Sequence, residues 1–213
     1  MEARAVRFSL GDGPVLEGRL AVPPQPRGAA VLCHPYPPLG GSMSNALLPP
    51  LQRALAAAGW AALRFNFRGA GRSEGSFDGG RGEIDDVAAA LAFIRSETPD
   101  VPVAIAGWSF GAIIGLVAAA RDGAVAAYAG IAPPVSAASR IELPATPASE
   151  AVVGIRTLFV CGTEDPVSRP DDARDLAQRY DGEVFVVEGA GHFFDGHHDV
   201  VTGRVASFFD AAT

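Results

Sequence analysis

One segment of the chain has the residue types and the spacing of an activated serine. Gly107-Trp108-Ser109-Phe110-Gly111 follows the apolar run Val103–Ala106 and opens a second apolar stretch, Phe110–Ala120. A G-x-S-x-G sequence between a strand and a helix places the serine on a sharp turn, where its hydroxyl projects from the sheet. The flanking glycines let neighbouring backbone approach without a Cβ clash. The alternative, a glycine-rich turn with an incidental serine, is disfavoured by the patterns on both sides.

A serine hydroxyl is a weak nucleophile and needs a general base. His192, in Gly189-Ala190-Gly191-His192-Phe193-Phe194, follows the last predicted strand and is the expected base. His197 and His198 lie in a polar stretch and are interpreted as exposed loop residues. For His34, which follows another strand, a structural role in bracing its loop is favoured over a catalytic one.

The base in turn needs an acid that orients it. The segment Thr157–Asp165 is interpreted as a strand followed by a loop, and Asp165 is the expected acid, with Glu164 as the alternative. The chain order serine, acid, histidine is typical of strand-end triads that contain this serine motif. All three residues follow predicted strands, so a parallel sheet would gather them at its carboxyl edge.

The tetrahedral oxyanion needs backbone donors. The N–H of Phe110, at a helix N-terminus beside the serine, is one candidate. The second is expected from Cys33-His34-Pro35-Tyr36-Pro37-Pro38, where the prolines have no N–H. Since His34 lies right at the strand end, Tyr36 is the preferred donor.

Several apolar side chains flank these positions and are candidates for an acyl pocket, although core packing explains each of them equally well. They are Tyr36, Met43, Trp108, Phe110, Phe193 and Phe194. Tyr36, Trp108 and Phe193 are the predicted substrate contacts.

The rest of the chain predicts the elements that position these residues. Arg4–Leu10 and Val15–Val22 flank Gly11-Asp12-Gly13-Pro14 and predict a β-hairpin. Further strands are predicted at Ala29–Cys33, Ala61–Phe67, Val103–Ala106, Ala126–Ile131, Thr157–Cys161 and Glu183–Val187. Helices are predicted at Ala46–Ala58, around Ile84–Leu91, at Phe110–Ala120, around Ala173–Tyr180 and at Val200–Phe209. This alternation indicates an α/β fold, with a mostly parallel sheet covered by helices on both faces, in one domain spanning residues 1–213.

Composition excludes several functional classes. With 213 residues, 48% hydrophobic and 19% charged, the chain is expected to be globular. Its net charge is −7 and it has no cluster of Lys and Arg, so no nucleic-acid partner is expected. The N-terminus lacks the apolar region of a signal peptide, and the longest apolar stretch is too short for a membrane span, so we expect a cytoplasmic protein without a membrane partner.

No cofactor or metal is expected. Cys33 and Cys161 lie in apolar runs and are interpreted as buried thiols, and no Cys or His pair has zinc spacing. Gly69-Ala70-Gly71 lacks the third glycine of a dinucleotide motif, because Glu74 stands there. Asp85 and Asp86 are interpreted as acids in the first turn of a helix rather than as a catalytic pair.

Together these motifs resemble the α/β-hydrolase superfamily over essentially the whole chain. The matching segments are His34-Pro35-Tyr36-Pro37 with Gly40-Gly41 and Asn45, then Arg68-Gly69-Ala70-Gly71-Arg72-Ser73, and the serine, acid and histidine loops. They look most like small serine esterases and dienelactone hydrolases without a large cap. The resemblance implies an eight-stranded, mostly parallel sheet and hydrolysis of esters, thioesters or related acyl bonds. One departure is Asn66, where many relatives have Asp, and it is expected to change a structural contact rather than the chemistry.

The expected function is hydrolysis of a small-molecule carboxylic ester or thioester through an acyl-enzyme intermediate. An acyltransferase or peptidase with the same triad, and a non-catalytic binding protein on a hydrolase fold, remain alternatives. The segment Ala132–Arg156 is too short for a multi-helix cap and contains four prolines, so we expect an extended loop with at most one or two short turns. Ser109 should then lie in a shallow groove walled by Tyr36, Gly40-Gly41 and Phe193-Phe194. The oligomeric state, a homodimer included, stays open.

Overall fold

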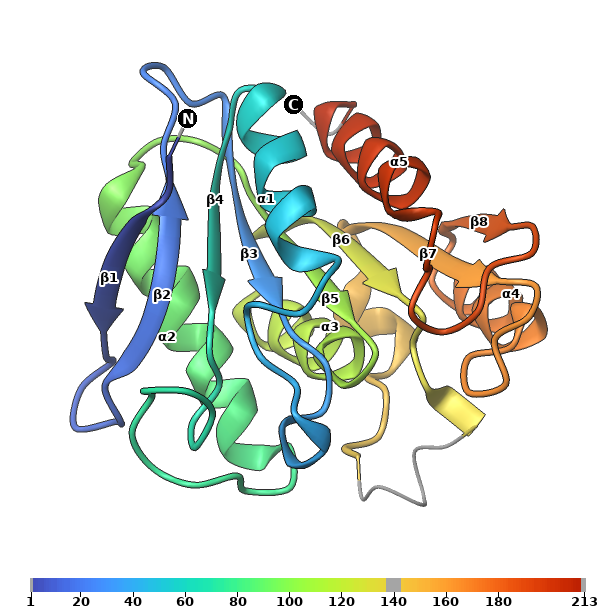
Figure 1. The fold of residues 1–213 in the computed structure, drawn as a ribbon, viewed down its shortest axis with the longest axis horizontal. Coiled ribbons are helices and arrows are strands. Elements are labelled where there is room, and N and C mark those ends of the chain that lie inside the picture. Colours follow the sequence, from blue (N-terminus) through green and yellow to red (C-terminus); the bar gives the residue numbers. More distant parts are fainter. Residues whose placement is uncertain (1, 137–142, 212–213) are drawn as a thin grey trace.

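The computed structural model describes residues 2–136 and 143–211, which form an eight-stranded sheet flanked by helices (Figure 1). The strand order is β1-β2-β4-β3-β5-β6-β7-β8. The bounds are β1 Arg4–Phe8, β2 Leu16–Ala21, β3 Gly28–Cys33, β4 Trp60–Phe65, β5 Val103–Trp108, β6 Val125–Ile131, β7 Arg156–Gly162 and β8 Glu183–Val187. Strand β2 is antiparallel to both of its neighbours, and the other pairs are parallel. The predicted eight-stranded, mostly parallel sheet is therefore confirmed.

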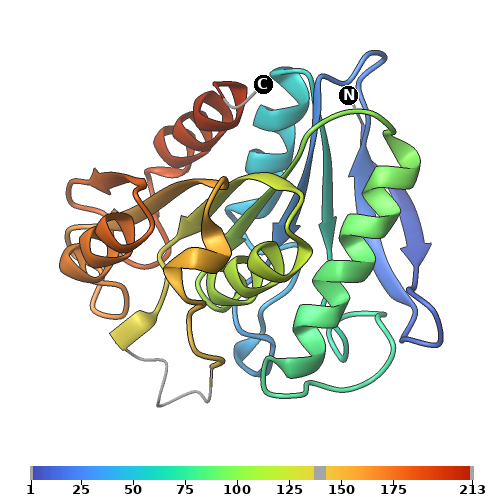
Figure 2. The same ribbon diagram turned by 180° about the vertical axis from the view of Figure 1, so that it is seen from behind.

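Helices cover both faces of this sheet, as expected for buried parallel strands. The helices α1 (Leu48–Ala57) and α5 (His198–Asp210) pack on one face. The other face carries α2 (Arg81–Glu97), α3 (Phe110–Asp122) and α4 (Pro170–Arg179), which come to the front in the reverse view (Figure 2).

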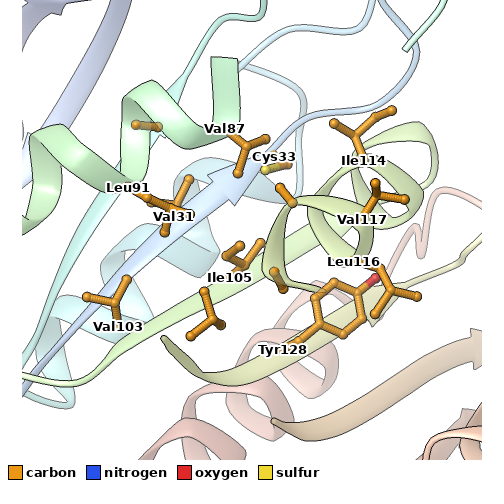
Figure 3. Packing of buried hydrophobic residues seen from close by; sticks show 14 of the residues in the cluster. Val31, Cys33, Val87, Leu91, Val103, Ile105, Ile114, Leu116, Val117 and Tyr128 are labelled. Atoms are coloured by element: carbon orange, nitrogen blue, oxygen red, sulfur yellow. The ribbon is translucent and has the colours of Figure 1, made fainter. Parts of the chain in front are cut away.

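Alternate residues of each central strand belong to the two halves of the core. In β3, Val31 and Cys33 pack with Val87 and Leu91 of α2 and with residues of α3 (Figure 3). The intervening Leu32 belongs to the cluster under α1 and α5. Because both faces are buried, the strands are continuous apolar runs rather than alternating ones.

Helix α2 begins at Arg81, earlier than its apolar periodicity predicted. Asp85 and Asp86 therefore lie in the second turn, and the expectation of a first-turn position was wrong. Asp86 is buried and accepts hydrogen bonds from the backbone N–H of Arg68 at 2.8 Å and from its Nη2 at 2.7 Å. Burial raises the pKa of Asp86, although these bonds oppose the shift. The carboxylate holds the loop after β4 against α2, which is a structural role.

The connection from β6 to β7 carries no large cap in the part that the structure describes. Its longest helical segment there is the 3₁₀ turn Ser149–Val152. Residues 137–142 of this connection lie outside the described residues. No helix of the described chain is both long and apolar enough to cross a bilayer.

Candidate active site

Ser109 occupies a strained position between β5 and α3. Its φ is +56°, in the left-handed region that residues with a Cβ rarely adopt. The glycines on either side permit this turn. A Cβ on Gly107 would lie 2.1 Å from the carbonyl oxygen of Gly111, and a Cβ on Gly111 would lie 2.5 Å from that of Cys33. The spacing of the motif thus reflects two backbone approaches that only glycine allows.

A chain of hydrogen bonds joins Ser109, His192 and Asp165. The Nε2 atom of His192 lies 3.0 Å from Oγ of Ser109, and its Nδ1 lies 2.8 Å from Oδ2 of Asp165. The three residues come from the loops after β5, β7 and β8, so the carboxyl edge of the parallel sheet brings them together. Ser109 keeps 8% of its surface exposed.

The structure brings Asp165, and not Glu164, to the histidine. The Asp165 side chain is fully buried, and its Oδ1 accepts hydrogen bonds from the N–H groups of Val167 at 2.7 Å and Ser168 at 2.9 Å. Glu164 is exposed, although its N–H donates to the carbonyl of Ala190 in the histidine loop. One oxygen of Asp165 is thus fixed by its own loop, and the other is left to face His192.

A contact that the sequence did not predict holds the histidine loop. The indole Nε1–H of Trp108 donates to the carbonyl oxygen of His192 at 3.2 Å. The ring of Phe193 packs edge-on against Trp108, with 6.0 Å between centroids. Trp108, directly before the serine in sequence, therefore holds the His192 loop and also lines the cavity that contains Ser109. An indole next to a motif serine was the available signal, but its partner lies 84 residues away.

The two predicted oxyanion donors lie on segments in close contact. Phe110 is the first residue of α3, where the N–H groups have no partner within the helix. The ring of Tyr36 packs on that of Phe110 at 5.5 Å between centroids. The close approach of Gly111 to Cys33 and His34 brings the loop after β3 against the start of α3. Tyr36 and Ser109 line the same cavity.

This cavity has a volume of about 600 Å³ and is predominantly apolar. Its described lining consists of Pro35, Tyr36, Leu39, Gly41, Asn45, Trp108, Ser109, Pro134, Pro166, Val167, His192 and Phe193. All three predicted substrate contacts are among them. Sequence reasoning missed Leu39, Pro134, Pro166 and Val167, although two of these directly follow Asp165.

Three of the flanking apolar side chains lie elsewhere. Phe194 is fully buried in the core under α1 and α5, so the expectation that it walls the groove was wrong. Phe110 is also fully buried, within the cluster on the opposite face. Met43 lines a separate cavity beside α1. In the pair Phe193-Phe194, the exposed first ring faces the site and the second anchors the loop.

His34 has a structural position. Its Nδ1 lies 2.6 Å from the carbonyl oxygen of Pro35, and its Nε2 accepts the N–H of Phe67 at 3.0 Å. Desolvation by burial lowers its pKa to about 4, so the imidazole is neutral at pH 7. It braces the loop that carries Tyr36. Burial also raises the pKa of both thiols, Cys33 and Cys161.

The other two histidines differ from the sequence interpretation. His197 and His198 are half-buried rather than exposed, and His198 begins α5. Each has a ring nitrogen within hydrogen-bond distance of a nearby carbonyl: Asp195 at 2.9 Å for His197, and Phe193 at 3.0 Å for His198.

Asn66 both accepts and donates a hydrogen bond, and an ionised aspartate could not donate the second of them. Its Oδ1 accepts the N–H of Met43 at 2.7 Å, while its Nδ2 donates to the Glu17 carboxylate at 2.7 Å. An aspartate would place a second carboxylate against Glu17, so the amide suits this neighbour.

Comparison with known proteins agrees with this architecture. The family model for the alpha/beta hydrolase fold matches residues 31–151, more than half of the chain. The chain belongs to the α/β-hydrolase fold family. This hydrolase is also 31% identical over 188 residues to an uncharacterized protein of Rickettsia prowazekii, covering 84% of this chain and 77% of that one.

Two solved structures are similar over nearly the whole length of this hydrolase. One is an α/β serine hydrolase without lid from Xanthomonas campestris, with 30% identity, a TM-score of 0.81, and coverage of 97% of this chain and 93% of that one. The other is an α/β serine hydrolase homologue from Coxiella burnetii, with 28% identity, a TM-score of 0.83, and coverage of 98% of both chains. Both similar structures are thus described as serine hydrolases or their homologues, and the first of them as lacking a lid.

Proposed function

We propose that this hydrolase cleaves neutral carboxylic esters or thioesters through an acyl-enzyme formed on Ser109. The observation that carries this proposal is the continuous hydrogen-bond chain from Ser109 through His192 to Asp165. In acylation, His192 Nε2 takes the hydroxyl proton as Ser109 Oγ attacks the acyl carbon. The same nitrogen then returns the proton to the leaving alcohol or thiol. Water, activated by His192, attacks the acyl-enzyme in the second half and releases the acid.

Asp165 holds the proton of His192 on Nδ1 and stabilises the imidazolium as it forms. With Oδ1 already occupied by two loop N–H groups, the carboxylate cannot turn away from the histidine. The N–H groups of Phe110 and Tyr36 would stabilise the oxyanion. A donor of this type contributes about 10²- to 10³-fold to kcat in a well-studied protease.

The lining of the cavity supports an uncharged substrate. His192 and Tyr36 are the only ionisable residues in its described lining. The aromatic rings and prolines would bury an apolar acyl group, whereas a carboxylate there would lose its hydration without gaining a cationic partner. The apolar lining therefore favours plain esters over substrates that carry a carboxylate near the reacting bond.

The test uses a fluorophosphonate probe and two matched substrates. We expect the probe to label Ser109 and the variant Ser109→Ala to lose both labelling and ester turnover, since loss of a triad serine costs about six orders of magnitude in a known case. p-Nitrophenyl butyrate should be a better substrate than mono-p-nitrophenyl succinate, which adds a carboxylate. Full turnover by Ser109→Ala, with circular dichroism verifying the fold, would contradict the mechanism.

A further inference from the structure

A second cavity, of about 430 Å³, lies beside α1, and its described lining shares no residue with the cavity that contains Ser109. Three arginines from three elements line it: Arg19 of β2, Arg53 of α1 and Arg64 of β4. The chain has a net charge of −7, so the three guanidinium groups gathered in one cavity are opposite in sign to the charge of the protein as a whole. We call this space the arginine cavity. The rest of its described lining is Glu2, Ala3, Ala21, Met43, Ser44, Pro49, Gln52 and Ala56.

The three arginines repel one another when no ligand is bound. Arg19 and Arg64 are direct partners across the antiparallel pair β2–β4, and like charges directly opposite each other destabilise a sheet. Burial lowers the pKa of Arg64, and the charges of Arg19 and Arg53 lower it further. Among the described ion pairs, none involves any of the three. Glu2 is the one acidic residue of the described lining and forms none of the described ion pairs, so the arginines exceed it by two charges, which are left for a ligand to neutralise.

A buried glutamine holds this arrangement in place. Gln52 is 3% exposed, and its Nε2 donates to the carbonyl oxygens of Arg19 at 2.7 Å and Ala62 at 2.8 Å. Its Oε1 accepts from Nε of Arg64 at 2.8 Å, while Nη1 of Arg64 donates to the carbonyl of Met43 at 2.8 Å. The guanidinium plane of Arg64 is thus fixed on two sides. A fixed guanidinium loses less conformational freedom on binding an anion than a free surface side chain does.

We propose that the arginine cavity binds a phosphate-bearing small molecule, with a diphosphate as its preferred anionic group. Planar guanidinium groups bind phosphate oxygens through paired, charge-assisted hydrogen bonds. Three of them match a group that carries two or more negative charges. The cavity volume lies within the range of about 300–1,000 Å³ that is typical of small-molecule sites. Arg19 and Arg53 are exposed, so the site is open to solvent, and Arg64 is half-buried.

Titration calorimetry with inorganic pyrophosphate at constant ionic strength tests this proposal. We expect one site per chain, with affinity reduced about tenfold or more in Arg19→Gln and in Arg53→Gln, because a hydrogen bond to a charged group is lost. The control Arg121→Gln removes the same charge from an exposed position in α3 outside the cavity, and it should bind like the wild type. Ser109→Ala should also bind normally, which separates this site from the proposed ester hydrolysis.

A second measurement is the melting temperature without ligand. Arg19→Gln should melt at a higher temperature than the wild type, because it removes the repulsion with Arg64, whereas Arg121→Gln should not. Absence of saturable pyrophosphate binding, or equal weakening by Arg121→Gln, would overturn the proposal. If the protein bound only to vesicles that contain an anionic phospholipid, the cavity would be assigned to a lipid headgroup, and the proposal of a soluble small-molecule ligand would be overturned.

Discussion

Gly111→Ala tests whether the close approach of the loop after β3 to the start of α3 builds the oxyanion site. The new Cβ would lie 2.5 Å from the carbonyl oxygen of Cys33 and 2.6 Å from that of His34. Both obstacles are backbone atoms, so they cannot rotate away. Ordinary contact begins near 3.4 Å, so the two segments must separate by about 0.9 Å (3.4 minus 2.5).

That separation would move the N–H of Tyr36 away from the N–H of Phe110. A misplacement of about 1 Å costs on the order of 10²-fold in rate, and losing one oxyanion donor costs about 10²- to 10³-fold. We therefore expect kcat to fall about 10²-fold, with little change in KM. Overpacking should also lower the free energy of unfolding by about 1–3 kcal/mol.

The assay is steady-state hydrolysis of p-nitrophenyl butyrate, together with thermal unfolding. The matched control is Gly203→Ala, in α5, where an added Cβ would meet nothing within 4 Å. It should keep wild-type kcat and gain about 0.5–1 kcal/mol of stability from helix propensity. If Gly111→Ala folds and its kcat stays within about threefold of wild type, the close approach does not build the oxyanion site, and this reasoning fails.

Two further predictions concern the histidines. Asp165→Asn should fold but lose about 10⁴-fold in kcat, measured on the same ester, because an amide N–H facing Nδ1 of His192 would leave the ring proton on Nε2, toward Ser109; near-wild-type activity would contradict the assignment of the acid. The pKa of His34 is about 4 in the folded protein, against the ordinary 6.5, so the unfolded chain binds a proton on this imidazole more readily than the folded chain does. The contribution of neutral His34 to the free energy of unfolding is therefore complete above about pH 6.5 and is lost as the pH falls toward 4. That loss amounts to about 3 kcal/mol. In urea unfolding measured from pH 7 to 4, the free energy of unfolding should fall less steeply in His34→Gln than in the wild type. Equal slopes for the two proteins would refute the buried neutral state of His34 and its bond from Phe67.

Local sequence was enough to predict the turn at Ser109. The clash that Gly107 avoids is with Gly111, four residues along, so the need for that glycine is visible in the spacing alone, whereas Gly111 avoids Cys33 and His34 of a distant loop. The parallel strands were also predictable, because β3 and β5 are apolar at every position and must be covered on both faces. Once those strands are parallel, the loops with Ser109, Asp165 and His192 have to meet at one edge.

Only the tertiary structure decided which of two adjacent residues faces the site. Asp165 and Glu164 share a loop and a chemistry, and the difference arises because the N–H groups after Asp165 close the loop around its carboxylate. In Phe193-Phe194, a positive φ at Phe194 turns the second ring into the core. The sequence favoured Asp165 but left Glu164 open, and it did not show that Phe194 turns away from the site.

The arginine cavity lay further beyond the reach of sequence analysis. Arg53 and Arg64 are single charges in a helix and a strand, Arg19 shares its strand with Glu17, and nothing marks any of the three within its own segment. Strand register places Arg19 opposite Arg64, and the packing of α1 on the sheet adds Arg53. Register depends on the burial of whole strand faces and helix position on the core beneath it, so the meeting of these three charges is a consequence of the assembled fold.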